Sequence, residues 1–204
     1  MNKYISKCCG AEVEVQNGTG DFRDSDKSMT HWHVCLGCKK ACDIMNKKAI
    51  EKIYRIKQRN KNKPFSFICS DLKNISNYAK VSNYAYKTMK RLLPGPYTFI
   101  LEGSRMVPKI MLTKRKTAGI RVPDHEICLR LVEGLENPII STSASMPDGE
   151  IIHDPSLLHD HFGVNIDLVI DGGPVSDEPS SVVSLINDEP EVFRKGLGDV
   201  SSFE

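Results

Sequence analysis

The feature that most constrains the fold is an abrupt change of pattern within residues 34–53, VCLGCKKACDIMNKKAIEKI. Three cysteines fall within eight positions, and the chain then becomes a basic segment whose apolar residues have helical spacing. Closely spaced cysteines suit metal ligation, whereas an amphipathic helix needs a partner surface for its apolar side. We therefore expect two units, a small head over residues 1–41 and a larger domain over residues 42–204.

The head carries a pair of cysteines on each side of an expected hairpin. Residues 11–16 alternate apolar and polar side chains as a strand does, residues 17–20 form a turn, and residues 30–35 form the returning strand. A hairpin this small has no core, and four thiolates around one tetrahedral Zn²⁺ supply the folding energy of such modules. We expect a structural zinc site with the ligands Cys8, Cys9, Cys35 and Cys38.

The set of zinc ligands stays open, because adjacent cysteines bind one metal only if the backbone bends tightly. Cys42 is the alternate ligand, and His31 and His33 are imidazoles held in reserve. The other interpretation is a set of exposed thiols on an unstructured tail. The head is similar to short zinc-ribbon proteins in which Cys-Cys is followed by Cys-x-x-Cys and a further Cys-Asp, a likeness confined to residues 1–43.

Charge is divided unevenly along the chain. The formal net charge is +2, but residues 39–130 carry 22 Lys and Arg against 6 Asp and Glu, whereas residues 131–204 carry 2 against 15. The basic block suits a phosphate-bearing partner, either a nucleotide or RNA. The alternative is that the two halves of one domain face and neutralise each other.

The first residues and the lengths of the apolar runs indicate the cellular compartment. No apolar run reaches the ~18 residues of a membrane span, and the first residues lack the apolar core of a signal peptide. We therefore expect a cytoplasmic protein with no membrane partner. In that compartment, cysteines favour metal ligation or burial over disulfides.

From residue 46 onward, helical and strand patterns alternate. Helices are expected at residues 46–58, 107–115 and 124–135, with two more within 70–93. Strands are expected at residues 65–70, 117–123, 138–144, 167–173, 180–186 and 191–196, and residues 94–101 are expected to form a turn followed by a strand. This alternation predicts an α/β domain built around one twisted sheet, mixed rather than purely parallel.

Short polar side chains precede several of these helices. The expected N-caps are Asp124, Asp71 or Ser70, and Ser82 or Asn83. Cys69 and Cys128 lie in apolar stretches, so we expect both to be inert thiols in the core.

Two polar clusters lie where a phosphate ligand can bind. KQRNKNK, residues 57–63, has lysine or arginine at alternate positions, and in an extended loop these side chains project to one side and can hold a triphosphate or a carboxylate. STSAS, residues 141–145, places hydroxyls at the end of an expected buried strand, where open α/β sheets commonly bind ligands. Each cluster alone also fits a plainer interpretation, a solvated charge run or a serine-rich turn.

Six motifs over residues 42–204 resemble, in order and spacing, those of the YrdC family, especially its YciO-like branch. They are KQRNKNKPFSFIC, LPGPYTFIL, GIRVPDH, STSAS, SSVVSL and VFRKGLGDV. The resemblance implies a twisted α/β fold with a positively charged concave cleft. It implies synthesis of L-threonylcarbamoyladenylate from threonine, bicarbonate and ATP with Mg²⁺, releasing pyrophosphate, for N6-threonylcarbamoyladenosine formation in tRNA.

The same resemblance assigns candidate site residues. It implies that Lys57 and Arg59 clamp ATP phosphates and the substrate carboxylate, and that Arg121 faces threonine or its carbamate. The expected nucleotide- and substrate-binding residues are Ser141, Ser143, Ser181 and Arg194, with Lys63 added from the basic cluster. Attack of a carbamate on the α-phosphorus needs charge neutralisation and alignment more than a general base, so these residue types suit the reaction.

The chain departs from the family pattern in two places. The family's Ser-Ala-Asn reads Ser143-Ala144-Ser145, and its N-terminal Pro-Thr-Asp-x-x-Tyr segment is replaced by the cysteine-rich head. The strand at residues 30–35 either pairs in the sheet at the vacated position, or the domain lacks that strand. The second functional hypothesis is therefore a non-catalytic relative that holds a nucleotide or structured RNA in its basic cleft.

Overall fold

The computed structural model describes the backbone of a large part of the chain. The described residues are 4–6, 13–18, 30–35, 44–58, 65–73, 75–104, 107, 116–146, 149–173, 176 and 178–204, with side chains from residue 49 onward. The α-helices are α1 (Lys47–Ile56), α2 (Asn83–Leu92), α3 (Glu126–Leu135) and α4 (Pro155–Phe162). Short 3₁₀ turns occur at Ile75–Asn77, Ile186–Asp188 and Ser201–Phe203.

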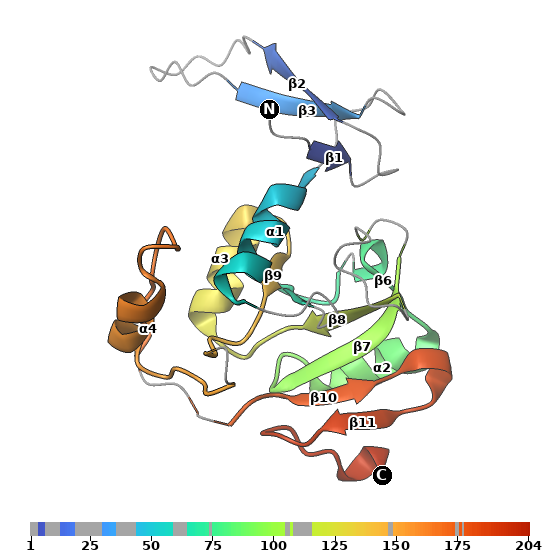
Figure 1. The fold of residues 1–204 in the computed structure, drawn as a ribbon. Helices are drawn as coiled ribbons and strands as arrows, with labels where there is room; N and C mark the ends of the chain where they lie inside the picture. Colours follow the sequence, from blue (N-terminus) through green and yellow to red (C-terminus); the bar gives the residue numbers. More distant parts are fainter. Residues whose placement is uncertain are drawn as a thin grey trace.

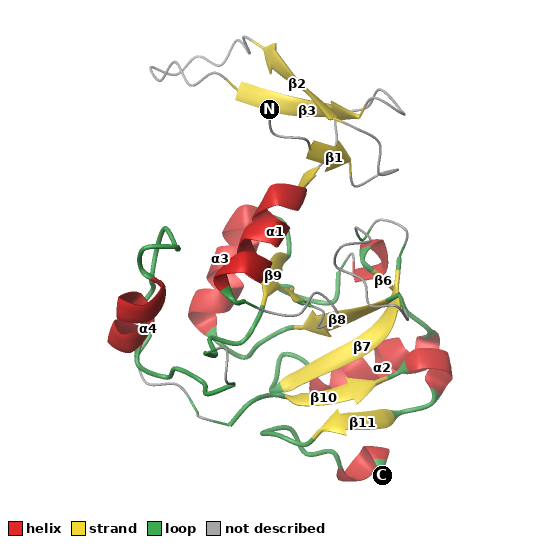
Figure 2. Cartoon of the chain, viewed as in Figure 1, coloured by secondary structure: helices red, strands yellow, loops and turns green. Residues whose placement is uncertain are grey.

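Seven of the strands form one mixed sheet (Figures 1 and 2). They are β5 (Ser66–Ile68), β6 (Ala79–Lys80), β7 (Tyr97–Gly103), β8 (Thr117–Arg121), β9 (Ile139–Ser141), β10 (Ser181–Ser184) and β11 (Glu191–Arg194). The order is β11-β10-β7-β8-β5-β9, with β6 paired to β7. The β7–β10 and β5–β8 pairs are parallel and the others antiparallel, which confirms the expected α/β fold with a mixed sheet.

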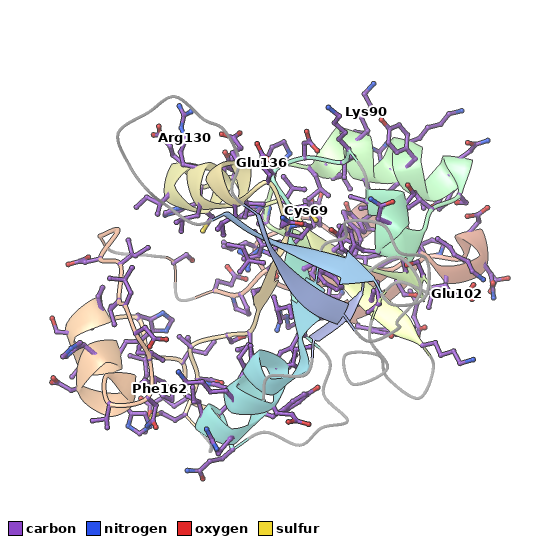
Figure 3. The ribbon with its side chains drawn as sticks, turned by 90° about the horizontal axis from the view of Figure 1, so that it is seen from above. Cys69, Lys90, Glu102, Arg130, Glu136 and Phe162 are labelled. Carbon is purple, nitrogen blue, oxygen red and sulfur yellow. The ribbon has the colours of Figure 1, made fainter. Side chains whose placement is uncertain are left out.

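The core lies between the sheet and helices on both of its sides. α2 and α3 lie on one side of the sheet and α1 on the other (Figures 1 and 3). Phe99 and Ile120, from the neighbouring strands β7 and β8, are fully buried, as are Ile50 of α1 and Met89 of α2. α1 and α2 therefore bury apolar side chains against the sheet, the arrangement that amphipathic spacing predicts.

The four strands that precede α1 pair with one another rather than with this sheet. β1 (Tyr4–Ser6) pairs with β4 (Ile44–Asn46), and β2 (Val13–Gly18) pairs antiparallel with β3 (Thr30–Cys35). The expected hairpin between residues 11 and 35 is thus present in the described backbone. The hypothesis that residues 30–35 occupy a position in the large sheet is wrong, because β3 is hydrogen-bonded to β2 instead.

The helix starts were predicted with mixed success. Ser82 caps α2, and its Oγ accepts a hydrogen bond from the Ala85 amide at 3.0 Å. Asp124 is not a cap: α3 begins one residue later than expected, with His125 at the N-cap and no side-chain hydrogen bond to the helix. The first helix expected within 70–93 is only the short 3₁₀ turn at Ile75–Asn77. Residues 108–115 of the helix expected at 107–115 lie outside the described residues.

The expected strand at residues 167–173 is absent, although the structure describes all seven of these residues. Its end is a local turn in which Asp171 Oδ1 accepts a hydrogen bond from the Gly173 amide at 2.9 Å, with Gly173 at φ +82°. α4 was not predicted, although its start carries a clear signal. Asp154 caps it by accepting from the Ser156 amide at 2.7 Å, and Pro155 fills the first helical position.

Candidate functional site

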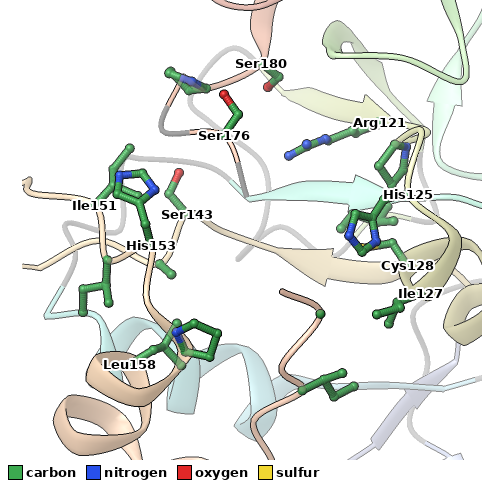
Figure 4. Close-up of a pocket in the computed structure, with 18 of the residues that line it drawn as sticks. Arg121, His125, Ile127, Cys128, Ser143, Ile151, His153, Leu158, Ser176 and Ser180 are labelled. Atoms are coloured by element: carbon green, nitrogen blue, oxygen red, sulfur yellow. The ribbon is translucent and has the colours of Figure 1, made fainter. Parts of the chain in front are cut away.

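A cavity of about 580 Å³ opens beside the amino end of α3. One wall carries Arg121, His125 and Cys128, and the facing wall carries Ile151, His153 and Leu158, with Ser143, Ser176 and Ser180 also on the lining (Figure 4). The polar groups of Arg121 and the serines face the same space as apolar side chains of α3 and of residues 168–170. Such a lining suits an amphipathic ligand that carries negative charge.

Arg121 ends β8 and projects its guanidinium into this cavity (Figure 4). Its Nε atom is buried and has no hydrogen-bond partner among the described residues. Burial lowers the pKa of the guanidinium, the neighbouring Cys128 raises it, and the like charge of Arg194 lowers it further. A half-buried cation without an anionic partner is costly, and a bound anion removes that cost.

Arg194, at the end of β11, supplies the second cation. Its Nε donates to the Ser180 carbonyl oxygen at 2.9 Å, and its Nη2 to Ser180 Oγ at 3.3 Å. Ser180 Oγ also lies 3.0 Å from Thr98 Oγ1, so the contact is anchored in the core. These bonds fix the position of Arg194 on the cavity wall without neutralising its charge.

The predicted serines fall into two groups. Ser143 lines the cavity, as expected for a ligand contact. Ser141 and Ser181 bond within the fold instead: Ser141 Oγ donates to the Ser66 carbonyl at 3.3 Å, and the fully buried Ser181 Oγ donates to the Gly198 carbonyl at 2.6 Å. The hydroxyl that reaches the cavity is that of Ser180, the residue before Ser181.

Lys57, just after α1, is not among the residues that line the cavity. Its ammonium donates to the Ser145 carbonyl oxygen, lies 3.5 Å from Ser145 Oγ, and sits 4.9 Å from the ring centroid of Phe162. Lys57 thus links the end of α1 to the segment between β9 and α4. Arg59 and Lys63, predicted alongside it, lie outside the described residues.

Sequence reasoning missed His125, Cys128, Ser176 and Ser180 as cavity residues. His125 closes the motif GIRVPDH, and Ser180 opens SSVVSL, so both were within reach of the motifs already singled out. Cys128 is half-buried on the cavity wall rather than in the core, contrary to expectation. Cys69 is buried as predicted, and burial, followed by the nearby Asp71 charge, raises the pKa of its thiol to about 12.

The predicted zinc ligands fall mostly outside the description. Cys8, Cys9, Cys38 and the alternate Cys42 are outside the described residues, and Cys35 is described only as the last backbone position of β3. The register sets Cys35 opposite Val13, which follows Cys9 by four positions in the sequence. Across the described part of the chain, no group of three or more His, Cys, Asp or Glu side chains is arranged to hold a metal ion.

None of the helices in the described part of the chain is long and apolar enough to cross a membrane.

Comparison with known proteins shows that the chain is similar to a family of proteins and to solved structures. A family model named for Sua5, YciO and YrdC, and described as telomere recombination, matches residues 39–196. The uncharacterized protein YciO of Escherichia coli K12 is 42% identical over 170 residues, which are 82% of this chain and 81% of that protein. The crystal structure of E. coli YciO matches with a TM-score of 0.74 at 33% identity, covering 100% of this chain and 87% of that one.

Two further relatives have names that state a chemistry or a ligand. A putative threonylcarbamoyl-AMP synthase of Methanocaldococcus jannaschii is 32% identical over 158 residues, 77% of this chain and 74% of that protein. The crystal structure of Pyrococcus abyssi Sua5 complexed with L-threonine matches with a TM-score of 0.70 at 29% identity, covering 74% of this chain and 45% of that one.

Proposed function

Because the chain belongs to the Sua5, YciO and YrdC family, we propose that it acts as a threonylcarbamoyl-AMP synthase. The amine of threonine condenses with bicarbonate to a carbamate with loss of water, a carbamate oxygen attacks the α-phosphorus of ATP, and the bond to the leaving pyrophosphate breaks. The product then serves N6-threonylcarbamoyladenosine formation in tRNA. Relatives named for this activity, and one relative crystallised with L-threonine, support the assignment.

The observation that carries the proposal is the Arg121 guanidinium, whose buried Nε has no hydrogen-bond partner among the described residues and which feels the like charge of Arg194. The reaction moves negative charge among a carboxylate, a carbamate and a polyphosphate, all of which carry anionic oxygens. Two cations at the edge of a partly apolar cavity can stabilise that charge more strongly than they could in bulk water. In this scheme Arg121 and Arg194 align the anions, and the hydroxyls of Ser143 and Ser180 donate to their oxygens.

Magnesium enters this proposal as the companion of ATP. Mg²⁺ prefers one or two carboxylates together with substrate phosphates and water, rather than a cage made of protein ligands alone. Glu178, exposed on the cavity lining, is a carboxylate that fits this role. The ion would neutralise phosphate charge, and the chain's own residues would orient the reacting groups.

The proposal also includes a structural Zn²⁺ held by Cys8, Cys9, Cys35 and Cys38, with Cys42 as the alternate ligand. The β2–β3 hairpin supports it, since the register sets Cys35 against Val13, close in sequence to Cys9. Zinc content of purified protein tests this directly, with about one equivalent expected. Single Cys→Ser changes at the four sites should each lower that content, whereas Cys69→Ser should leave it unchanged.

The activity is tested by product formation from ATP, Mg²⁺, threonine and bicarbonate. Threonylcarbamoyl-AMP would be followed chromatographically, beside a reaction without threonine. Product that depends on both threonine and bicarbonate is the expected result. Folded protein that binds ATP but forms no product would remove the catalytic assignment.

A second candidate function, RNA binding without catalysis, rests on the outer face of α2. Lys87, Lys90 and Arg91 are exposed there, interleaved with Tyr84 (40% exposed) and Tyr86 (43% exposed). α2 has no acidic residue, and its three cations form no ion pair with described residues. Lys90 points away from the body of the protein (Figure 3). Cations interleaved with exposed aromatic rings suit phosphate contact and base stacking.

This candidate predicts RNA affinity that falls steeply as salt rises. Changing Lys87, Lys90 and Arg91 to Gln should lower the slope of log affinity against log salt by about 2–3. Lys80→Gln is the matched control, because Lys80 is already paired with Glu102 at 2.6 Å. A slope that does not differ between the triple variant and the control would place RNA binding elsewhere or nowhere.

A further inference from the structure

His125 lies on the cavity wall at the start of α3, beside Arg121 (Figure 4). It occupies the N-cap position, yet its side chain makes no capping hydrogen bond. Its Nδ1 atom is buried and has no partner among the described residues. The ring therefore makes no hydrogen bond to the helix, and its Nδ1 makes none to any described residue.

The burial of Nδ1 determines which ring nitrogen carries the proton. A neutral imidazole has one N–H donor and one bare acceptor. Buried N–H groups without a partner are rarer in proteins than buried acceptors without one, so the bare nitrogen is the better atom to leave unsatisfied. The proton therefore belongs on Nε2, and His125 presents an N–H donor on the edge of the ring opposite to Nδ1.

Gly172 lies near the same ring. A Cβ built on Gly172 would lie 3.0 Å from Ile127 Cδ1, 3.6 Å from His125 Cε1 and 3.9 Å from His125 Nε2. Gly172 and His125 both line the cavity, so the Nε2 side of the ring borders the ligand space. A methyl group at position 172 would be tight against Ile127 and in ordinary van der Waals contact with His125.

We propose that His125 is a ligand-positioning residue whose Nε2–H donates to the anionic oxygen held by Arg121. The guanidinium of Arg121 and the N–H of His125 then converge on a single anion. The cation balances the negative charge, and the two donors together fix the orientation of the anion. The identity of the anion rests on the proposed function: it is either a phosphate of the nucleotide or the carboxylate of the amino acid. Both present the same chemistry to His125.

Two substitutions separate the ring nitrogens, since the amide nitrogen of Gln lies near the position of Nε2 and that of Asn near the position of Nδ1. The affinities for inorganic pyrophosphate and for L-threonine would each be measured by titration calorimetry on the full chain. We expect His125→Gln to bind within about threefold of the parent, and His125→Asn to bind about tenfold more weakly or worse, for at least one ligand. The ligand that weakens identifies the anion.

The control is His159→Asn, because His159 lies on the exposed surface of α4 outside the cavity lining. Equal affinities of the Gln and Asn variants for both ligands, whether strong or weak, would overturn the inference. If His125→Asn does not fold, His125→Ala decides: it removes the Nε2–H donor and should weaken the same ligand about tenfold or more. Unchanged binding by His125→Ala would then overturn the inference.

These measurements do not depend on turnover. A parent protein that forms no product, but shows the Gln and Asn difference in binding, would refute the proposed function and support the role of His125. A parent that forms product, together with equal ligand affinities of the His125→Gln and His125→Asn variants, would support the proposed function and refute the role of His125.

Discussion

The two ends of α3 carry opposite charge in different surroundings. At the amino end, Arg121 is half-buried on the cavity wall, and the like charge of Arg194 acts on it. At the carboxyl end, a second hollow of about 380 Å³ is lined by three exposed carboxylates and one exposed cation, namely Asp71, Glu133, Glu136 and Lys73, and is net acidic. The helix dipole favours anions at the amino end and cations at the carboxyl end, so Glu126 in the first turn follows it, whereas Arg121 and the carboxylates at the carboxyl end oppose it.

Exposure decides what each arrangement costs. The carboxylates at the carboxyl end are hydrated and screened, and Arg130 lies 3.8 Å from Glu133, so their repulsion is small. The guanidinium at the amino end has lost part of its hydration and has no anionic partner among the described side chains. An unpaired charge that is partly buried therefore indicates a binding site. An unpaired charge that is hydrated does not.

The largest expected effect tests the amino end. Arg121→Gln should lower threonylcarbamoyl-AMP formation by about 100-fold or more, because removal of one preorganised donor to a developing anion typically costs that much. The steady-state rate of product formation measures the effect. Arg130→Gln is the matched control on the exposed side of α3 and should change the rate by less than about twofold.

If Arg121→Gln and Arg130→Gln lowered the rate of product formation equally, the difference in exposure between the two arginines would not explain function. Unfolding in urea provides a check on folding. Arg121→Gln should not lower the free energy of unfolding without ligand, because the guanidinium is desolvated and unpartnered in the described structure.

The two ends of α3 can also be compared through the pH dependence of stability, because each has a cysteine beside it. Cys69 borders the acidic hollow, and Cys128 borders the cavity. The pKa of Cys69 rises from 9.0 to about 12 in the folded protein. Above pH 9 the unfolded chain loses this proton while the folded protein keeps it, so the unfolded state binds fewer protons and stability falls. The loss is up to about 1.4 kcal/mol per pH unit, and the full stability is present below pH 9.

Urea unfolding between pH 8 and pH 11 measures this slope. Cys69→Ala should flatten the decline relative to the parent, whereas Cys128→Ala should retain it. Parallel curves for the parent and Cys69→Ala would show that Cys69 is not shielded from ionisation as the structure indicates.

The fold was largely predictable from the sequence because each element carries a local signal. The alternation of apolar residues in FSFICS and TAGIRVP, and the helical spacing around Ile50, require only neighbours along the chain. The exceptions have physical causes. DLVIDGG reads as a strand, but its two glycines and the Asp171 turn end it before any strand of the sheet pairs with it.

The site was less predictable, because a hydroxyl's direction depends on tertiary contacts. Ser180 and Ser181 are neighbours in sequence and point to opposite surroundings, one to the cavity and one to the Gly198 carbonyl. His125 stood in a motif already singled out, but the burial of its Nδ1 is visible only once α3 is packed. Motifs bring the right segments together; packing selects which side chains face the ligand.

A smaller effect concerns the backbone at the carboxyl end of α3. Glu136 is the C-cap residue with φ 52° and ψ 16°, the left-handed region that favours glycine. Glu136→Gly should raise the free energy of unfolding by about 0.5–1 kcal/mol, because relief of the strain exceeds the entropy lost by glycine. Glu136→Ala is the control: it removes the same charge but keeps the strain, so it should give no gain. A gain of equal size in both would assign the effect to charge instead.

The smallest effect is expected at Glu133, on the exposed side of the same helix end. Glu133→Gln removes one carboxylate from the acidic hollow and its 3.8 Å contact with Arg130. Exposed pairs of this kind contribute within about 0.5 kcal/mol, so both the free energy of unfolding and the rate of product formation should stay near those of the parent. A loss of activity approaching that of Arg121→Gln would mean that the two ends of α3 are coupled. The acidic hollow would then belong to the functional site. The burial of a charge would not, in that case, be sufficient to locate the functional site.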